Sequence, residues 1–239
     1  MAEHVNQLGL PIGFPLPQWT PRPRPPRSAM EGRFCYIEPI EPARHAADLH
    51  AAYLLDKEGR NWTYLPYGPF ARLEEYRSWL ERACLSDDPL VHAIIERQRG
   101  RAVGVASYMR IDPGPGVIEV GGINYAPPLQ RTAAATEAMY LMMRRVFDEL
   151  GYRRYEWKCD SLNAPSRAAA LRLGFRYEGM FRQATVYKAR NRDTCWFSIL
   201  DRDWPALKSG FERWLDPDNF DAMGRQRRSL SRLGRSAPR

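Results

Sequence analysis

Between residues 33 and 215 the apolar residues switch repeatedly between a two-residue period and a helical period. The two-residue period and short apolar runs predict strands at 33–40, 90–97, 102–111, 117–126, 154–160, 175–188 and 194–201. Helical spacing predicts helices at 42–55, 71–85, 133–150, 163–173 and 203–215. Strands that alternate with helices in this way form a sheet covered by helices. The pattern therefore predicts one α/β domain over 31–220, with a mixed central sheet and helices on both faces.

The two ends of the chain differ from this domain in composition. Residues 1–30 contain the proline-rich segment PIGFPLPQWTPRPRPPR, which has no periodic pattern and predicts an extended arm. Residues 221–239 hold six arginines and one acidic residue, and predict a basic, flexible tail. These ends carry most of the net charge of +8, so the central domain is nearly neutral. We therefore expect no nucleic-acid partner beyond weak, salt-sensitive contacts of the tail.

The cysteines and the apolar runs indicate the compartment. The cysteines Cys35, Cys84, Cys159 and Cys195 are far apart and form no C-x-x-C pair, so we expect free thiols in a reducing compartment. The four histidines complete no metal-ligand spacing with them, and no metal is expected. No apolar run is long enough to cross a bilayer, and the N-terminus lacks the regions of a signal peptide. The sequence predicts a cytoplasmic protein with no membrane partner.

The start of the helix at 133–150 has the features of an anion site. Its first turn is Ala133-Ala134-Ala135, and small residues let an anion approach the unpaired N–H groups at the positive end of a helix. The polar run Gln130-Arg131-Thr132 comes before it, and Gln130 and Arg131 can close over a phosphate. Neither GxxxxGK[ST] nor GxGxxG is present, which argues against a P-loop or a Rossmann site. An alanine-rich helix packed tightly on the sheet is the alternative, and composition alone favours it.

Three linked motifs resemble the GCN5-related N-acetyltransferase (GNAT) superfamily. Residues 130–135, QRTAAA, resemble its acetyl-coenzyme-A pyrophosphate loop, Q/R-x-x-G-x-G/A, with Ala133 in place of the first glycine. The branch that includes the ribosomal-protein N-terminal acetyltransferases is similar in three further places: TEA at 136–138, NAPS at 163–166 followed by LGFRYEG at 173–179, and Asp193 before the strand at 194–200. The resemblance covers roughly 33–205. It implies the GNAT fold, acetyl-CoA as co-substrate and an amine as acceptor.

The resemblance also implies where the coenzyme binds. In the family the pantetheine arm lies against the strand that corresponds to 117–126, where Gly121-Gly122 predicts a bulge or a close backbone approach. Backbone N–H groups around this point would polarise the thioester carbonyl. The expected coenzyme-binding residues are Ile123, Asn124, Tyr125, Gln130, Arg131, Thr132, Ala133, Ala134, Ala135, Asn163 and Ser166.

GNAT enzymes transfer the acetyl group by direct attack of the amine, so the resemblance implies a base and a proton donor. Glu119 is the candidate base, because many members use a glutamate on this strand; a surface glutamate is the alternative. Ser166 matches a proposed proton donor to the departing thiolate, and Tyr187 is a second candidate acid. Related N-terminal acetyltransferases have a glutamate where this chain has Thr185, so the base stays open.

Two hypotheses on function follow. The first is an acetyl-CoA-dependent N-acetyltransferase that acts on a primary amine of a small molecule or of a protein N-terminus. The second is a non-catalytic acyl-CoA-binding or RNA-associated module, which Ala133 and Thr185 favour slightly. The matching residues Gln130, Arg131, Asn163 and Ser166 favour the first hypothesis more. We expect the acceptor pocket to be lined by 61–70, the following helix and 180–192. No acidic cluster marks a polyamine or aminoglycoside site, and a homodimer is compatible with the sequence.

Overall fold

The computed structural model describes residues 4–233 of the chain. Its centre is an eight-stranded sheet in the order β3-β4-β5-β6-β7-β8-β10-β9. The strands are β3 (Met30–Glu31), β4 (Cys35–Pro39), β5 (Leu90–Glu96), β6 (Arg101–Asp112), β7 (Val117–Tyr125), β8 (Arg154–Asp160), β9 (Arg176–Tyr187) and β10 (Arg190–Leu200). All neighbouring strands are antiparallel except β7 and β8, which are parallel. The predicted mixed sheet is confirmed.

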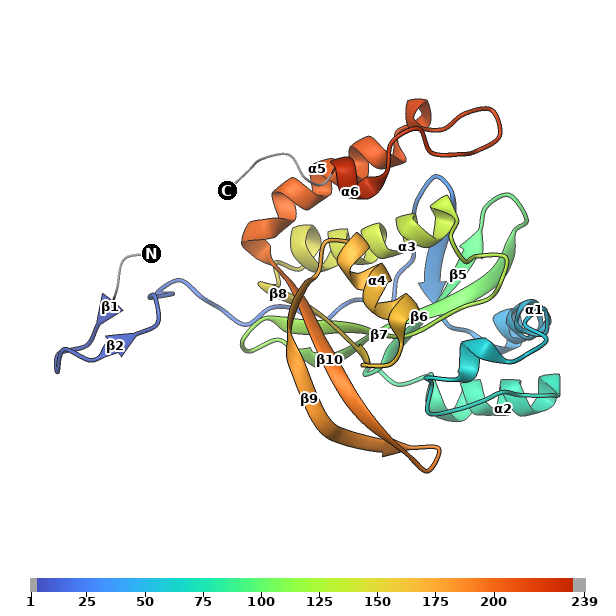
Figure 1. Ribbon diagram of the computed structural model, residues 1–239, viewed down its shortest axis with the longest axis horizontal. Helices are drawn as coiled ribbons and strands as arrows, with labels where there is room; N and C mark the ends of the chain where they lie inside the picture. Colours follow the sequence, from blue (N-terminus) through green and yellow to red (C-terminus); the bar gives the residue numbers. More distant parts are fainter. Residues whose placement is uncertain (1–3, 234–239) are drawn as a thin grey trace.

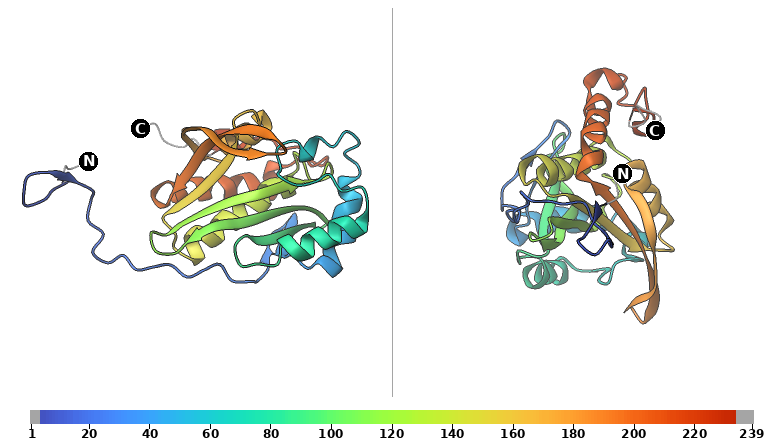
Figure 2. Two further views of the ribbon diagram at one scale, coloured as in Figure 1. Left: turned by 90° about the horizontal axis from the view of Figure 1, so that it is seen from below. Right: turned by 90° about the vertical axis from the view of Figure 1, so that its left-hand side faces the viewer.

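Helices cover both faces of the sheet, as the sequence predicted (Figures 1 and 2). The helices are α1 (Pro42–Tyr53), α2 (Leu73–Ala83), α3 (Ala133–Arg144), α4 (Ala164–Arg172) and α5 (Trp204–Leu215). The first two lie on one face, and α3, α4 and α5 lie on the other. Helix α3 makes the crossover that parallel neighbours need between β7 and β8. None of the helices within residues 4–233 is long and apolar enough to cross a membrane.

Helix α3 is buried between the sheet and α5. Apolar residues occur all round it, which is typical of a helix covered on both sides. Its outer face packs on α5, where Tyr140 stacks against Trp204 at 6.2 Å and contacts Phe211 at 5.6 Å between ring centroids. Helix α3 continues as a π-helical turn, η2 (Arg145–Glu149). This packing fixes the direction in which the first turn of α3 points.

Glu137 in α3 is a buried carboxylate with a structural role. It is 4% exposed and accepts backbone N–H bonds from Arg33 at 2.8 Å, from Phe34 at 2.6 Å and from Cys35 at 2.9 Å. A buried charge is tolerated when its hydrogen bonds are satisfied, and bonds to a charged acceptor are strong. Glu137 therefore fastens the start of β4 onto α3.

The substitution Glu137→Gln is expected to lower the free energy of unfolding by about 2–4 kcal/mol, because a neutral amide offers one acceptor oxygen to three buried N–H groups. Urea unfolding followed by circular dichroism measures the change. Glu74→Gln on the exposed surface of α2 is the control, with an expected change of about 0.5 kcal/mol or less. Equal midpoints for both variants would contradict this role of Glu137.

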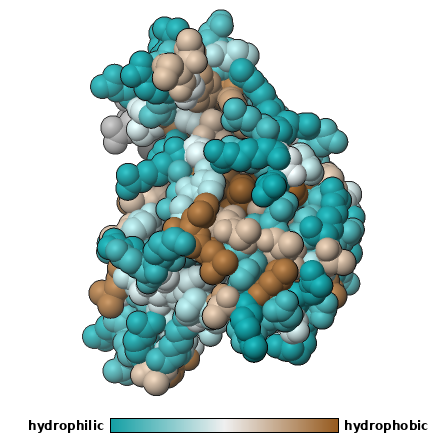
Figure 3. Space-filling view, turned by 90° about the vertical axis from the view of Figure 1, so that its right-hand side faces the viewer, coloured by the Kyte–Doolittle hydropathy of each residue, from teal (hydrophilic) through white to brown (hydrophobic). Residues whose placement is uncertain are grey.

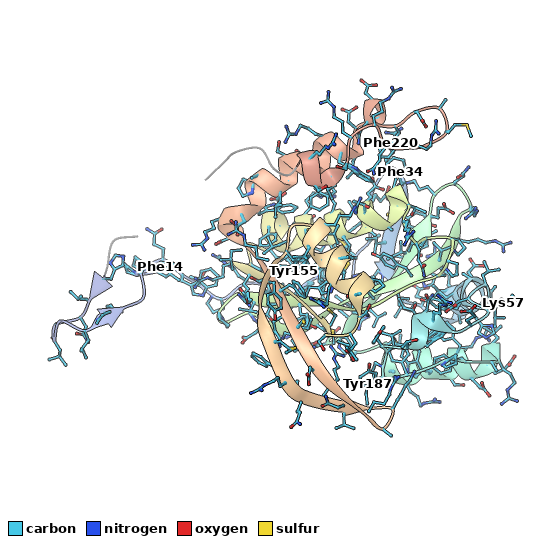
Figure 4. All side chains as sticks on the ribbon, in the orientation of Figure 1. Phe14, Phe34, Lys57, Tyr155, Tyr187 and Phe220 are labelled. Carbon is cyan, nitrogen blue, oxygen red and sulfur yellow. The ribbon has the colours of Figure 1, made fainter. Side chains whose placement is uncertain are left out.

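The N-terminal segment is partly an extended arm, as expected, but it also contains paired strands. Strands β1 (His4–Val5) and β2 (Pro11–Ile12) form a hairpin that stands apart from the domain (Figure 1). The arm is attached further along, where Trp19 Nε1 donates to the carbonyl of Gly114 at 2.7 Å and Arg27 pairs with Asp87 at 2.8 Å. Phe14, labelled in Figure 4, lies on the arm between the hairpin and Trp19, and its ring centroid is 5.8 Å from the guanidinium carbon of Arg153.

The prediction of a flexible C-terminal tail is wrong for residues 221–233. Leu230, at the start of the short helix α6 (Leu230–Leu233), is 4% exposed. Gln226 accepts a hydrogen bond from Trp214 Nε1 at 2.7 Å, and Phe220 packs edge to face on Phe34 at 5.4 Å (Figure 4). The arginine-rich composition concealed these anchoring side chains. The remaining predicted tail residues, 234–239, lie outside the described residues.

Candidate active site

The parallel strands β7 and β8 separate halfway along their length. Their pairing ends at Val120 and Trp157, although β7 continues to Tyr125 and β8 continues to Asp160. Strand β8 stays paired with β10 over this stretch. One edge of β7 beyond Val120 is therefore open, and an extended ligand can pair with it as an added strand.

A bulge in β7 marks the start of the open edge. On the β6 side, Gly121 pairs with Ser107 while Asn124 pairs with Val105, so β7 has one residue more than β6 between these pairs. Gly122 has a φ of +58°, in the region that glycine adopts most readily, and a β-carbon there would lie 3.1 Å from Ser107 Oγ. The bulge predicted from Gly121-Gly122 is confirmed.

The far end of the open edge is closed by two amide side chains. Gln130 Nε2 donates to the carbonyl of Tyr125 at 2.7 Å and to Asn61 Oδ1 at 2.9 Å, and Asn61 Nδ2 donates to the same carbonyl at 3.0 Å. The sequence predicted that Gln130 would close over a phosphate. In the structure its amide instead joins the loop before α2 to the end of β7.

Helix α3 begins one loop after β7, with free donors in its first turn. Thr132 is the cap, and its Oγ1 accepts a hydrogen bond from the N–H of Ala135 at 3.1 Å. Within residues 4–233 the N–H groups of Ala133 and Ala134 form no hydrogen bond, and the exposed side chain of Arg131 has no polar partner. Arg131 has a left-handed backbone, with φ +61°. Free N–H groups at the positive helix end and an adjacent free guanidinium suit a phosphate.

A cavity of about 810 Å³ lies beside the open edge of β7. Its walls come from residues 64–67, from α2 and from the β9–β10 hairpin, and it reaches Asn163 and Ser166 at the start of α4. These are the segments that the sequence predicted around an acceptor. Figure 3 shows apolar side chains gathered at the centre of the face that carries α1 and α2, surrounded by hydrophilic ones.

Glu119 lines this cavity and is 2% exposed, so the alternative of a surface glutamate is wrong. Arg110 donates to both of its oxygens, at 2.7 and 2.8 Å, and Lys158 Nζ lies 2.9 Å from Oε2. Lys158 also pairs with Glu156 at 2.9 Å. Three donors occupy three of the roughly four acceptor sites of the carboxylate, so Oε1 can still accept a proton or a hydrogen bond from a water molecule that relays one.

Ser166 lies in the first turn of α4, which Asn163 caps. Asn163 Oδ1 accepts from the N–H of Ser166 at 3.1 Å, and Ser166 Oγ accepts from Trp157 Nε1 at 3.0 Å. An indole N–H can only donate, so this bond leaves the hydroxyl proton of Ser166 available to another acceptor. Both residues line the cavity.

Tyr187 reaches the cavity from the end of β9 (Figure 4). Its hydroxyl donates to Asp160 Oδ2 at 2.8 Å, and Asp160 Oδ1 accepts from the N–H of Leu162 at 2.8 Å. Burial, together with the hydrogen bond to Asp160, raises the pKa of Tyr187 to about 12. Tyr187 therefore keeps its proton at neutral pH, but its hydroxyl already donates a hydrogen bond to Asp160.

All four cysteines are free thiols, as predicted, and two of them line the cavity. Burial raises the pKa of Cys84 to about 12 and also raises the pKa of Cys159. The thiolate is the reactive form of cysteine, and neither residue is a thiolate at neutral pH. Among residues 4–233, no group of three or more histidine, cysteine or acidic residues lies close enough together to hold a metal ion.

Four residues that position the candidate groups were not identified from the sequence: Arg110, Trp157, Lys158 and Asp160. A signal for Lys158 and Asp160 is present in the segment RYEWKCD of β8, where every second residue is charged. Such alternation indicates a strand with one apolar face and one polar face. The charged face of β8 is the one that meets Glu119 and Tyr187.

The fold, the separated strands and the free helix start define the architecture of an acetyltransferase. The family model described as "Acetyltransferase (GNAT) domain" matches residues 35–176. The chain belongs to the GNAT acetyltransferase family, which confirms the resemblance seen in the motifs, and it is an N-acetyltransferase of that family.

Known proteins with high similarity support this assignment. A GCN5-related N-acetyltransferase structure from Brucella melitensis has 49% identity and a TM-score of 0.90, over 92% of this chain and 99% of that one. A structure from Chromobacterium violaceum, described as a probable GNAT-family acetyltransferase, has 39% identity and a TM-score of 0.76, over 82% and 98%. The uncharacterized N-acetyltransferase YnaD of Bacillus subtilis has 23% identity over 157 residues, which is 66% of this chain and 90% of YnaD.

Proposed function

We propose that the protein transfers the acetyl group of acetyl-CoA directly to a primary amine. The observation that carries this proposal is the open edge of β7, which runs from the bulge at Gly121-Gly122 toward the free start of α3. An extended arm with a phosphate group at one end matches this layout, because the edge can pair with the arm and the helix start can bind the phosphate. The acceptor is a small molecule or a protein N-terminus.

The residues at this edge fit the coenzyme. Backbone groups of Ile123 and Tyr125 would pair with the pantetheine arm, and the buried Asn124 would support the strand from behind. Arg131, Ala133 and Ala134 would hold the diphosphate, while Thr132 and Ala135 form the cap beside it. Acetyl-CoA would supply the thioester.

Direct attack is favoured over an acyl-enzyme because the cavity offers no activated nucleophile. Cys84 and Cys159 hold their protons, and burial is the physical cause. In a direct reaction a C–N bond forms as the C–S bond breaks. One proton leaves the amine and one proton goes to the departing sulfur.

Glu119 is the proposed base, and it would act through a water molecule that bridges to the amine. Ser166 is the preferred donor to the sulfur, because its hydroxyl proton is not held by Trp157. Tyr187 is the alternative donor, and it would first have to release Asp160. Asn163 holds Ser166 in place through the helix cap.

The substitution Arg131→Ala tests the coenzyme site. It should weaken acetyl-CoA binding by roughly 1.5–3 kcal/mol, because one charge-assisted phosphate contact is lost. Isothermal titration calorimetry with acetyl-CoA and with phosphate-free acetylpantetheine separates this contact from the rest of the site, and only acetyl-CoA should be affected. Arg182→Ala, an exposed arginine on β9, is the control. Unchanged acetyl-CoA affinity in Arg131→Ala would remove Arg131 from the site.

A further inference from the structure

The cavity is lined by two close pairs of aromatic rings from different segments of the chain. Tyr67, before α2, stacks on Trp79 of α2 with 4.1 Å between ring centroids and 30° between planes. On the β9–β10 hairpin, Phe181 lies 4.6 Å from Trp196 at 33°. All four rings line the cavity. Because Lys158 Nζ lies over the Trp196 ring, a planar aromatic group of the acceptor would stack on the exposed Phe181 ring of the second pair, and such stacking adds to the free energy of burial.

The charges around the cavity favour an acceptor that is not a polycation. Two acidic residues line it, Glu119 and Asp160, and the oxygens of both already accept hydrogen bonds from protein groups. Three cationic residues line it as well: Arg110, Lys158 and Arg192. A second ammonium group on the acceptor would find no free carboxylate in the cavity and would be repelled by these cations.

Arg192 is the cation best suited to bind an anion from the acceptor. Lys158 is held by two carboxylates and lies 3.6 Å above the Trp196 ring, and Arg110 is paired at two points with Glu119. Arg192 donates from its Nε to Thr194 Oγ1 at 3.1 Å, and its guanidinium carbon lies 6.0 Å from the centroid of the Tyr187 ring. Its two terminal nitrogens have no hydrogen-bond partner among residues 4–233, and they can bind a carboxylate at two points.

We propose that the acceptor is a small primary amine that carries an aromatic ring and an acidic group, of the chemical type of an aromatic α-amino acid. The ring would stack on the exposed Phe181 among the aromatic side chains of the cavity, and the acidic group would pair with Arg192. The amine would then face Glu119 and the open edge of β7. This inference rests on the proposed acetyl transfer. It narrows the acceptor to one chemical class, and the cavity volume lies in the range of small-molecule sites.

The test uses the full chain and four amines at equal concentration: L-tryptophan, tryptamine, L-leucine and spermidine. Thiol release from acetyl-CoA is expected to be fastest with L-tryptophan and slowest with spermidine. Tryptamine lacks only the carboxylate of L-tryptophan, and L-leucine lacks the ring. Each missing group should lower kcat/KM about tenfold or more.

Two variants separate the contributions of the ring and the acid. Arg192→Gln should reduce the ratio of kcat/KM for L-tryptophan to kcat/KM for tryptamine by about tenfold. The different basicities of the two amines cancel when this ratio is compared between the natural protein and the variant. Phe181→Leu, at an exposed side chain, should raise KM for both aromatic amines by a larger factor than it raises KM for L-leucine. Arg182 does not line the cavity, so the control Arg182→Gln should change neither the ratio of L-tryptophan to tryptamine nor KM for the aromatic amines.

Calorimetry of L-tryptophan and spermidine with the protein, without acetyl-CoA, makes the result independent of catalysis. Tighter binding of L-tryptophan, lost in Arg192→Gln, supports the inference. Tighter binding or faster acetylation of spermidine overturns it and leaves the proposed acetyl transfer intact. An absence of acetyl-CoA binding and of thiol release with every amine is instead the failure of the proposed function.

Discussion

Glu119→Gln is expected to lower kcat/KM for an amine acceptor by about two to four orders of magnitude at neutral pH. Glutamine keeps the shape of the side chain but cannot take a proton, and at this pH an amine acceptor is mostly protonated. The loss should shrink as the pH approaches the pKa of the amine, about 10, because a growing share of the acceptor is then already unprotonated. A pH–rate profile from pH 7 to 10 with acetyl-CoA in excess measures this rescue.

The ion pairs around Glu119 require a control for structure. Glutamine leaves Arg110 without its two-point partner, although Lys158 retains Glu156. The acetyl-CoA affinity and the thermal midpoint of the variant are therefore measured beside its rate. Arg110→Gln removes the same ion pair but keeps the carboxylate, so it should lose much less activity. Equal losses in the two variants would mean that Glu119 is needed for structure rather than for proton transfer.

Ser166→Ala is expected to lower kcat by about two orders of magnitude with little change in acetyl-CoA affinity, because the departing sulfur loses its proton donor. Tyr187→Phe should have a smaller effect, since the Tyr187 hydroxyl is already engaged in a hydrogen bond to Asp160. Neither loss should be rescued at high pH, which separates both variants from Glu119→Gln. A larger loss of kcat in Tyr187→Phe than in Ser166→Ala would mean that Tyr187, and not Ser166, is the main proton donor to the departing sulfur.

The pKa of Tyr187 adds a test that needs no variant. Because this pKa is raised to about 12, the hydroxyl keeps its proton through the range in which an ordinary tyrosine, with a pKa of about 10, loses it. If Tyr187 donates the proton, kcat should stay level up to about pH 10.5 in the natural protein. In Asp160→Asn the pKa of Tyr187 should fall, since the bond and the charge that help to raise it are gone. An alkaline decrease in kcat should then appear at lower pH.

The position of the helix start was predictable because it depends on residues that are close in the sequence. Thr132 caps a helix that begins at Ala133, as a polar residue before a small-residue turn predicts. The bulge at Gly121-Gly122 was predictable for the same reason, since two adjacent glycines weaken a regular strand locally. The role of Gln130 was not predictable, because its partner Asn61 is 69 residues away and reaches it only in the folded chain.

The C-terminal segment was also predicted incorrectly because its contacts are with residues outside the segment. An arginine-rich segment with two leucines has no periodic pattern, and its composition predicts a flexible tail. Leu230 is nevertheless buried, and Gln226 is bonded to Trp214, because α5 and the neighbouring loop present partners for them. Whether a single apolar residue anchors a segment depends on the surface it meets, which a local pattern does not contain.

The sequence by itself determined the order of strands and helices from β4 to α5, the start of α3, the bulge in β7 and the GNAT family, since each depends on periodicity or on short motifs. Only the tertiary structure decided the environment of the candidate catalytic groups. Glu119 is buried between Arg110 and Lys158 because the register of β6, β7 and β8 places three distant side chains on one face of the sheet. Register is set by packing and by hydrogen bonds between strands, so a change of one residue would point Glu119 to the opposite face.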